Sequence, residues 1–243
     1  MIFEGAIATK AILEGKKRNI EYLIIDKTKK DRNTNYIINL ANKNNIKIIK
    51  DTRENIDKLA TGKTHGGILT YATNREYSKI NDIKTNNNET IFYIEGIEDP
   101  YNLGYALRSL YCFGINNVII NSNHLINSDN IIVKSSAGAS EKINIILSND
   151  TKNDINFIKN KGYETILLKR SSDSSIYYNT NYNGKYLVGI GGEKRGVSKD
   201  IEQLFDKFIY IPYTNDFRNS LNATSAIVTI ASEIQRQKLI KTQ

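Results

Sequence analysis

The stretch TIFYIEGIEDPYNLGYALRSLYCFGINNVIIN covers residues 90–121 and contains the pattern that decides the fold. Residues 91–95 form an apolar run typical of a buried strand, and residues 118–121 repeat that pattern. Between these runs, apolar side chains recur at helical spacing until Gly114 ends the stripe: Leu103, Ala106, Leu107, Leu110 and Phe113. A strand, a helix and another strand in this order predict a parallel sheet covered by helices.

The same alternation continues to the end of the chain. Further strands are predicted at residues 143–147, 165–168, 186–190 and 208–211. Helices are predicted at 151–161 and 198–205, and one apolar stripe over 223–234 predicts a final helix. Residues 90–243 are therefore expected to form one α/β domain.

The first 73 residues predict a separate, small αβ domain. Ile7, Ala11 and Ile12 have helical spacing, and three short strands are expected at 22–25, 46–49 and 68–72. Residues 74–89 are polar and interpreted as a linker. The alternative interpretation is a long surface loop within a single domain.

The net charge of +8 is unevenly distributed. Residues 1–75 contain 15 Lys and Arg against 8 Asp and Glu, whereas residues 76–243 contain 19 against 18. A basic first domain favours a polyanionic partner such as a nucleic acid. The alternative is compositional drift, because the abundance of Lys, Asn and Ile is also what an AT-rich genome produces.

Several classes of protein are disfavoured by composition. The longest apolar runs, of about six residues, are far shorter than the about 20 that a membrane span needs. The first residues have no long apolar segment typical of a signal peptide, so a cytoplasmic location is expected. One cysteine, Cys112, and two histidines make a disulfide framework or a metal site unlikely on composition, and we expect no metal.

A glycine-rich loop spans residues 189–196, between a predicted strand and a predicted helix. The dinucleotide-binding pattern needs a third glycine where this chain has Lys194, and a phosphate-binding Walker loop fails because Val197 follows Gly196. A loop whose backbone can approach a ligand closely remains, because glycine lacks a Cβ atom. A purely structural turn is the alternative.

Two further polar segments follow predicted strands, where ligands bind in open α/β sheets. Pro100 lies in the first, and the second runs from Pro212 to Ser225, where the last helix begins. Ser220 or Asn222 could simply cap that helix, and capping would not exclude contact with a ligand.

Together these three segments resemble the three motifs of the SpoU (TrmH-like) family of RNA ribose 2′-O-methyltransferases in the SPOUT superfamily. Motif one corresponds to Asn102, Gly104 and Arg108, and motif two to the loop 191–196. Motif three corresponds to Ile211-Pro212 followed by Ser220-Leu221-Asn222. Residues 1–73, which close on His65-Gly66-Gly67-Ile68, resemble the substrate-binding domain of RlmB-type rRNA methyltransferases.

The resemblance implies a SPOUT-type parallel sheet with a C-terminal trefoil knot, S-adenosylmethionine (SAM) as cofactor and a homodimer. It implies these cofactor-binding residues: Leu168, Gly191, Gly192, Gly196, Ile211 and Leu221. It implies these catalytic residues: Asn102, Arg108, Glu193, Ser220 and Asn222. Arg108 would remove the 2′-OH proton by family analogy, but a phosphate contact and stabilisation of the forming alkoxide remain open alternatives.

The expected function is SAM-dependent methylation of a ribose 2′-OH in RNA, with ribosomal RNA favoured. The alternatives are a tRNA ribose methyltransferase and a non-catalytic RNA-binding protein of the same fold. Two basic clusters, residues 16–18 and 27–32, are the candidate contacts of the first domain with RNA, or else an ordinary solvated surface.

Overall fold

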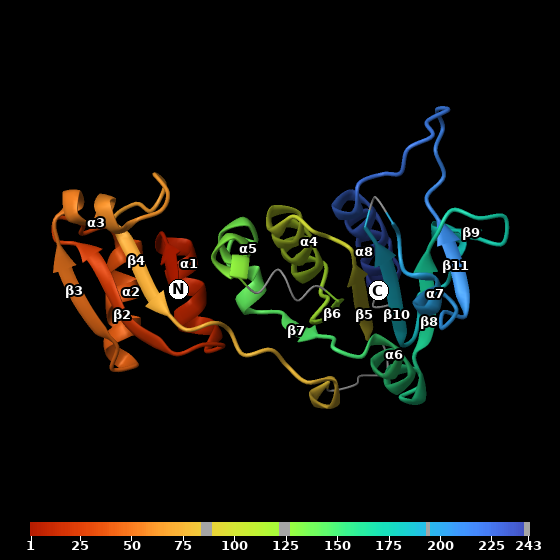
Figure 1. Cartoon of the computed structure of the whole chain (residues 1–243), viewed down its shortest axis with the longest axis horizontal. Coiled ribbons are helices and arrows are strands. Elements are labelled where there is room, and N and C mark those ends of the chain that lie inside the picture. The colour runs from red at the N-terminus through yellow and green to blue at the C-terminus, as the bar shows by residue number, and fades with distance from the viewer. Residues whose placement is uncertain (84–88, 122–126, 193–194, 241–243) are drawn as a thin grey trace.

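The computed structural model describes residues 1–83, 89–121, 127–192 and 195–240. Two sheets lie along the long axis of the molecule, and each carries its own helices (Figure 1). The first sheet has four strands and the second has seven. No helix within these described ranges is long and apolar enough to cross a membrane.

The first sheet mixes parallel and antiparallel pairs. Its strand order is β1 (Ile2–Glu4), β4 (Ile68–Ala72), β2 (Ile20–Asp26) and β3 (Lys47–Asp51). Only β2 and β3 run parallel. Its helices are α1 (Ala6–Gly15), α2 (Arg32–Lys43) and α3 (Arg53–Leu59). The prediction of three strands was wrong by one, because the three residues of β1 are too few to show a period.

The second sheet is parallel in every pairing, which confirms the predicted α/β class. Its strand order is β7 (Asn144–Leu147), β6 (Asn117–Asn121), β5 (Thr90–Glu95), β10 (Tyr186–Gly191), β8 (Glu164–Leu168), β11 (Lys207–Tyr210) and β9 (Ser175–Ile176). The residues of β5 and β10 are almost all buried, as a sheet covered on both faces requires.

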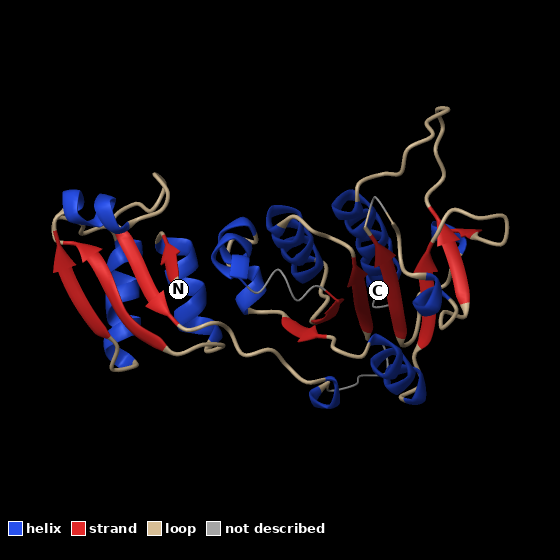
Figure 2. Ribbon diagram, viewed as in Figure 1, coloured by secondary structure: helices blue, strands red, loops and turns tan. Residues whose placement is uncertain are grey.

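Helices cover both faces of this sheet (Figure 2). Helices α4 (Pro100–Cys112) and α8 (Ala223–Ile240) form one core with one face of the strands. Helices α6 (Thr151–Asn160) and α7 (Lys199–Glu202) form a second core on the opposite face. Helix α5 (Asp129–Ser135) packs beside α4. Short 3₁₀ turns in the described ranges include η1 (Ile80–Asp82), η3 (Ala139–Glu141) and η4 (Tyr177–Asn179).

The structure differs from the sequence prediction at three elements of this domain. The helix predicted at 198–205 is only the four residues of α7, which end in turns through Leu204 and Phe205. Helix α5 was not predicted, because Ile131, Ile132 and Val133 are consecutive and show no helical period. Strand β9 has two residues and leaves no pattern to read.

The strand order determines where a ligand site can form. Strand β10 lies between β5 and β8, and all three run parallel. Their carboxyl ends therefore meet at one edge of the sheet. The segments that leave this edge include the three polar or glycine-rich segments singled out in the sequence.

Candidate functional site

A cavity of about 340 Å³ opens at this edge of the sheet. Its lining comes from the ends of β8, β10 and β11 and from the start of α8. It includes all six residues predicted to bind the cofactor: Leu168, Gly191, Gly192, Gly196, Ile211 and Leu221. Ser220, predicted as catalytic, lines the same cavity. The structure therefore brings together residues that lie more than 50 positions apart in the chain.

Two glycines allow the loop after β10 to fold back tightly on itself. A Cβ atom on Gly191 would lie 2.2 Å from the carbonyl carbon of Gly196. A Cβ atom on Gly192 would lie 2.1 Å from the backbone oxygen of Gly96, in the segment before α4. The loop is closed by a hydrogen bond that the Gly196 N–H donates to the Gly192 oxygen at 2.9 Å. Both positions therefore exclude any larger residue, and the bare backbone faces the cavity.

A second cavity, of about 180 Å³, adjoins the first. Gly192 and Ala223 line both cavities, and Asn102 lines only the second. Asn102 lies in the first turn of α4, which begins at Pro100 after the N-cap Asp99. The Asp99 carboxylate accepts hydrogen bonds from the N–H groups of Tyr101 and Asn102, at 3.2 and 3.3 Å.

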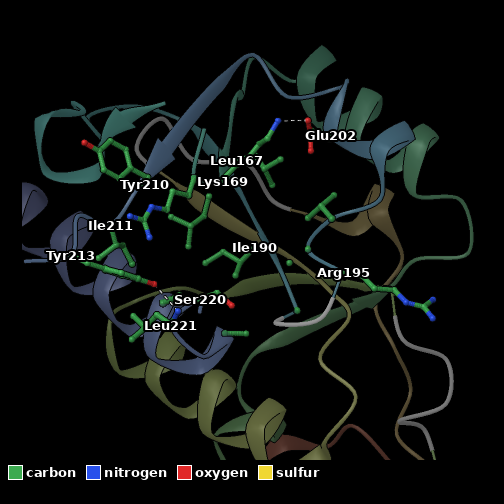
Figure 3. A pocket seen from close by; sticks show the side chains of 18 residues that line it. Leu167, Lys169, Ile190, Arg195, Glu202, Tyr210, Ile211, Tyr213, Ser220 and Leu221 are labelled. Carbon is green, nitrogen blue, oxygen red and sulfur yellow. Dashed lines mark hydrogen bonds and ion pairs between the residues drawn. The ribbon is translucent and has the colours of Figure 1, made fainter. Parts of the chain in front are cut away.

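The polar groups of the larger cavity come mainly from cationic and aromatic side chains (Figure 3). Lys169 Nζ lies 2.6 Å from Glu202 Oε1, and this hydrogen bond raises the pKa of Lys169. The guanidinium of Arg170 lies 5.0 Å from the ring centroid of Tyr213. The Tyr213 hydroxyl accepts a hydrogen bond from the Leu221 N–H at 2.6 Å, so it ties the two ends of segment 213–221 together.

Two residues of β5, the buried Tyr93 and the partly buried Glu95, contact the segment that follows the loop. The Tyr93 hydroxyl donates a hydrogen bond of 2.6 Å to Glu95 Oε2, and Glu95 Oε1 accepts one of 3.4 Å from the Ser198 N–H. Burial, followed by the contact with Glu95, raises the pKa of Tyr93 above its ordinary value. The hydroxyl therefore stays protonated and keeps donating to Glu95.

The remaining predicted catalytic residues do not gather at one point. Asn222 caps α8, because its Oδ1 accepts a hydrogen bond of 2.7 Å from the Ser225 N–H. Arg108 is exposed on α4, lines neither cavity, and has no hydrogen-bond or ion-pair partner among the described residues. Glu193 lies outside the described residues. The catalytic roles given to these residues stay predictions.

Sequence reasoning missed several residues of the lining. Lys169, Arg170 and Tyr213 were not singled out, although each lies within three residues of the end of a strand. The rule that ligands bind at the carboxyl ends of parallel strands could have found them. Within the described ranges there is no group of three or more His, Cys, Asp or Glu side chains that could hold a metal ion.

Comparison with known families matches both parts of the chain. Residues 89–231 match the SpoU rRNA Methylase family. Residues 3–78 match the family described as RNA 2′-O ribose methyltransferase substrate binding.

Full-length relatives agree with this match. The chain is 28% identical to a protein named as a TrmH family tRNA/rRNA methyltransferase in Staphylococcus saprophyticus, over 98% of this chain and 96% of that protein. It is 30% identical to a tRNA/rRNA methyltransferase of Borreliella burgdorferi, over 86% and 96%.

Solved structures share the fold. The SpoU methyltransferase AviRb from Streptomyces viridochromogenes, in complex with AdoMet, aligns with a TM-score of 0.82 at 15% identity, over 98% of this chain and 90% of that chain. An AdoMet-bound rRNA methyltransferase from Sinorhizobium meliloti aligns with a TM-score of 0.81 at 17% identity, over 97% and 86%. With the family match over residues 89–231, the resemblance of the three motifs is confirmed, and the chain belongs to the SpoU family of RNA methyltransferases.

Proposed function

We propose that this chain transfers a methyl group from S-adenosylmethionine to a ribose 2′-hydroxyl of RNA, with ribosomal RNA as the favoured substrate. One observation carries the proposal: the cavity lined by the predicted cofactor residues adjoins a smaller cavity lined by Asn102. Methyl transfer is an in-line displacement, so donor and acceptor must be held in contact. Orientation of this kind can lower a barrier by about 7–11 kcal/mol.

The larger cavity fits the proposed cofactor. Ligand sites are typically about 300–1,000 Å³ with a mostly apolar lining, and this cavity has that volume and character. Ile190, Ile211 and Leu221 supply apolar walls, and the backbone of Gly191 and Gly192 lies open at the loop. S-adenosylmethionine supplies a methyl group bound to a positively charged sulfur, which makes the methyl carbon electrophilic.

The smaller cavity is the proposed acceptor side. Asn102 offers both a donor and an acceptor to a ribose at the start of α4. Its backbone oxygen accepts a hydrogen bond of 3.2 Å from Thr224 Oγ1, which ties the start of α4 to the start of α8. We assign Ser220, Asn222 and Glu193 to supporting contacts with RNA and with the cofactor loop.

Arg108 requires a second subunit in this proposal. Six residues along a helix separate Asn102 and Arg108 by about 9 Å of rise and by about 120° around the axis. The two side chains therefore cannot both face one ribose from the same helix. Arg108 shares an exposed stripe of α4 with Tyr101, Tyr105 and Tyr111. Exposed aromatic residues beside an arginine are typical of a protein interface, so we propose a homodimer in which Arg108 reaches the partner's acceptor side.

Further features of the proposal rest on the first domain and on the family. The chain after β11 is proposed to pass through the loop that follows β10 and to form the trefoil knot. The first domain is proposed to hold RNA by charge. Ribosomal RNA is favoured over tRNA because an rRNA methyltransferase structure aligns over 97% of this chain, first domain included. We expect the reaction in the cytoplasm.

Labelled-methyl transfer from SAM into separate pools of unmodified rRNA, tRNA and DNA tests this proposal. We expect label as a 2′-O-methylnucleoside in rRNA and none in DNA, since only RNA has the 2′-hydroxyl. Label in tRNA would keep the reaction and overturn the substrate. No transfer and no binding of SAM would instead favour a non-catalytic RNA-binding protein.

A further inference from the structure

A buried arginine joins the first domain to the second. The side chain of Arg18 is 0% exposed and lies between two carboxylates of the second domain that are also buried, Asp129 and Glu141. Arg18 Nη2 is 2.6 Å from Glu141 Oε1 and 2.8 Å from Asp129 Oδ2. Within the first domain, Arg18 Nη1 donates to the Thr73 oxygen at 3.3 Å, and the guanidinium lies 4.4 Å from the ring centroid of Phe3. This arginine therefore contacts both domains at once.

A second buried arginine lies in the segment that connects the domains. Arg75 donates to the Ser140 oxygen at 2.8 Å and to the Ile143 oxygen at 3.4 Å. Arg75 and Asp129 line a small pocket of about 20 Å³ together with Leu103 of α4. Leu103 directly follows Asn102 in the chain, so this buried charge cluster extends to the helix that lines the acceptor cavity.

The backbones of the two domains also approach closely. A Cβ atom on Gly15, the last residue of α1, would lie 2.7 Å from the Glu141 oxygen. A Cβ atom on Gly138 would lie 2.4 Å from the Ala11 Cβ atom. Val133 of α5 is buried in the same apolar cluster as Phe3 and Ile12 of the first domain. Charge, backbone contact and apolar packing thus coincide at this interface.

Helix α5 transmits this contact to α4. It lies between the first sheet and α4 (Figure 1), and it contacts both. Asp129, which pairs with Arg18, is its first residue, and Ser135 is its last. Ser135 Oγ lies 3.4 Å from the Pro100 oxygen, and a Cβ atom on Gly104 would lie 1.9 Å from Ser135 Oγ. The last residue of α5 therefore contacts the first residues of α4 directly.

We propose that Arg18 and Arg75 lock the first domain onto the second as one rigid body, and that this lock positions Asn102 through α5. Arg18 is then a positioning residue, not a contact for RNA. The rigid docking stands independently of the proposed function, and only its effect on the acceptor side rests on that function. An RNA substrate would have to fit a fixed distance between the first domain and the acceptor cavity.

Distance measurement between two spin labels tests the lock. Cys112→Ser removes the only cysteine of the chain, and Asn39→Cys at an exposed position of α2 and Asn156→Cys at an exposed position of α6 carry the two labels. Labelled protein is diluted with unlabelled protein so that only distances within one chain are measured. We expect one narrow distance distribution, which Arg18→Met broadens or shifts by several ångströms. Lys16→Met is the matched control, because it removes the same charge from an exposed neighbour and should leave the distribution unchanged.

Two further variants keep the test decisive if Arg18→Met folds poorly. Gly15→Ala leaves every charge in place and favours helix α1, yet its new Cβ atom meets the Glu141 backbone, so it should also shift the distribution. Arg18→Lys should restore a narrow distribution in part. A broad distribution in the unmutated chain, or one that Arg18→Met and Gly15→Ala both leave unchanged, would overturn the rigid docking.

The positioning of Asn102 has its own measurement. At saturating RNA, we expect Arg18→Met to lower kcat at least tenfold while the Kd for SAM changes less than twofold, with Arg18→Lys intermediate. An unchanged kcat together with a broadened distance distribution would overturn the positioning role and leave the docking intact. If no variant and no unmutated chain methylates any RNA, the proposed function fails, and the label distances still decide the docking.

Discussion

Arg108 shows how the chemistry of a single residue limits its role. Arginine stays protonated in nearly every setting, so it is a poor proton acceptor. Its planar, cationic fork suits a phosphate, or an alkoxide that forms during transfer. Its exposure on α4 leaves the guanidinium available to either ligand.

We expect Arg108→Ala to reduce methyl transfer by about 10²–10³-fold, as the loss of a group that stabilises developing charge does. The affinity for SAM should be unchanged, because Arg108 is not in the lining of the larger cavity. Calorimetry of SAM binding and single-turnover transfer measure the two effects. A fall in kcat at constant KM for RNA would favour the alkoxide, and a rise in KM would favour the phosphate. Lost SAM affinity would contradict this division of roles.

Glu4 makes stability depend on pH in a direction that can be derived. Its carboxylate Oε1 accepts three hydrogen bonds of 2.6–2.9 Å, from the Thr61 N–H, the Thr61 hydroxyl and the Gly62 N–H. Burial raises the pKa of Glu4, but these bonds and the charge of Lys134 outweigh it and lower the pKa below its ordinary value. Because the pKa of Glu4 is lower in the folded chain than in the unfolded chain, ionised Glu4 stabilises the fold. This stabilisation is fully present above about pH 4.3 and is lost as the pH falls through the folded-state pKa.

Glu4→Gln should therefore lower the free energy of unfolding by about 1–3 kcal/mol at pH 7, as the loss of hydrogen bonds to a charged group does. The difference from the unmutated chain should shrink as the pH falls from about 4.3 through the lowered folded-state pKa of Glu4, because the carboxylate then becomes neutral like the Gln amide. Urea unfolding at pH 7 and at a pH below the folded-state pKa measures it. An equal cost at both values would assign the effect to side-chain shape and not to charge.

The sequence predicted the residues of the cofactor cavity better than the residues of the domain interface. Gly191, Ile211 and Leu221 belong to motifs with recognisable order, and all three line one cavity. Arg18 was interpreted as part of a basic surface cluster, and for this residue that interpretation was wrong. Its partner Glu141 lies 123 positions further along the chain, and no local pattern can reveal an ion pair of that span.

Among the helices and strands, apolar periodicity in the sequence correctly predicted the long elements. Helices α4 and α8 and the buried strands β5 and β10 were predicted because apolar residues recur over many positions. Strand β1 was missed because three residues show no period, and helix α5 was missed because its apolar residues are consecutive. These two missed elements contact each other across the interface between the domains.

The tight packing of the loop after β10 predicts a selective loss of cofactor affinity. In Gly192→Ala the new Cβ atom would meet the Gly96 backbone oxygen at 2.1 Å, so the backbone that lines both cavities must shift. We expect a rise of at least tenfold in the Kd for SAM, with the unfolding midpoint lowered by a few degrees. Gly62→Ala is the matched control, because its Cβ atom would meet the flexible ends of two side chains and no backbone: Glu4 Oε2 at 2.9 Å and Lys134 Nζ at 3.5 Å.

Calorimetry with both variants separates a local effect on the loop from a general effect of a larger side chain. SAM affinity that is retained in Gly192→Ala would mean that the loop tolerates displacement, and that the cofactor does not depend on its backbone. Equal losses in both variants would instead point to destabilisation of the whole chain.

For the whole molecule, the cationic side chains of residues 1–75 fall into two groups, one buried and one exposed. Arg18 and Arg75 are buried and join the domains. Lys27, Lys30 and Arg32 are exposed, whereas Lys29 pairs with Asp31 at 2.8 Å. The buried Arg18 cannot contact the phosphates of RNA, so the candidate surface, which keeps Lys16, Lys27, Lys30 and Arg32, is smaller than the sequence clusters indicated.

The salt dependence of RNA binding should therefore respond to where charge is removed. Each phosphate contact adds about 0.7–0.9 to the slope of log affinity against log salt concentration. We expect the double variant Lys27→Met/Lys30→Met to weaken RNA binding and to reduce this slope by about 1–2. The control Lys152→Met/Lys161→Met removes the same charge from exposed residues of α6 and its end, on the opposite domain, and should leave the slope unchanged. Titrations of fluorescent RNA at several salt concentrations measure both. Equal reductions would mean that net charge alone attracts RNA, and a steep slope in every variant would place the phosphate contacts elsewhere on the molecule.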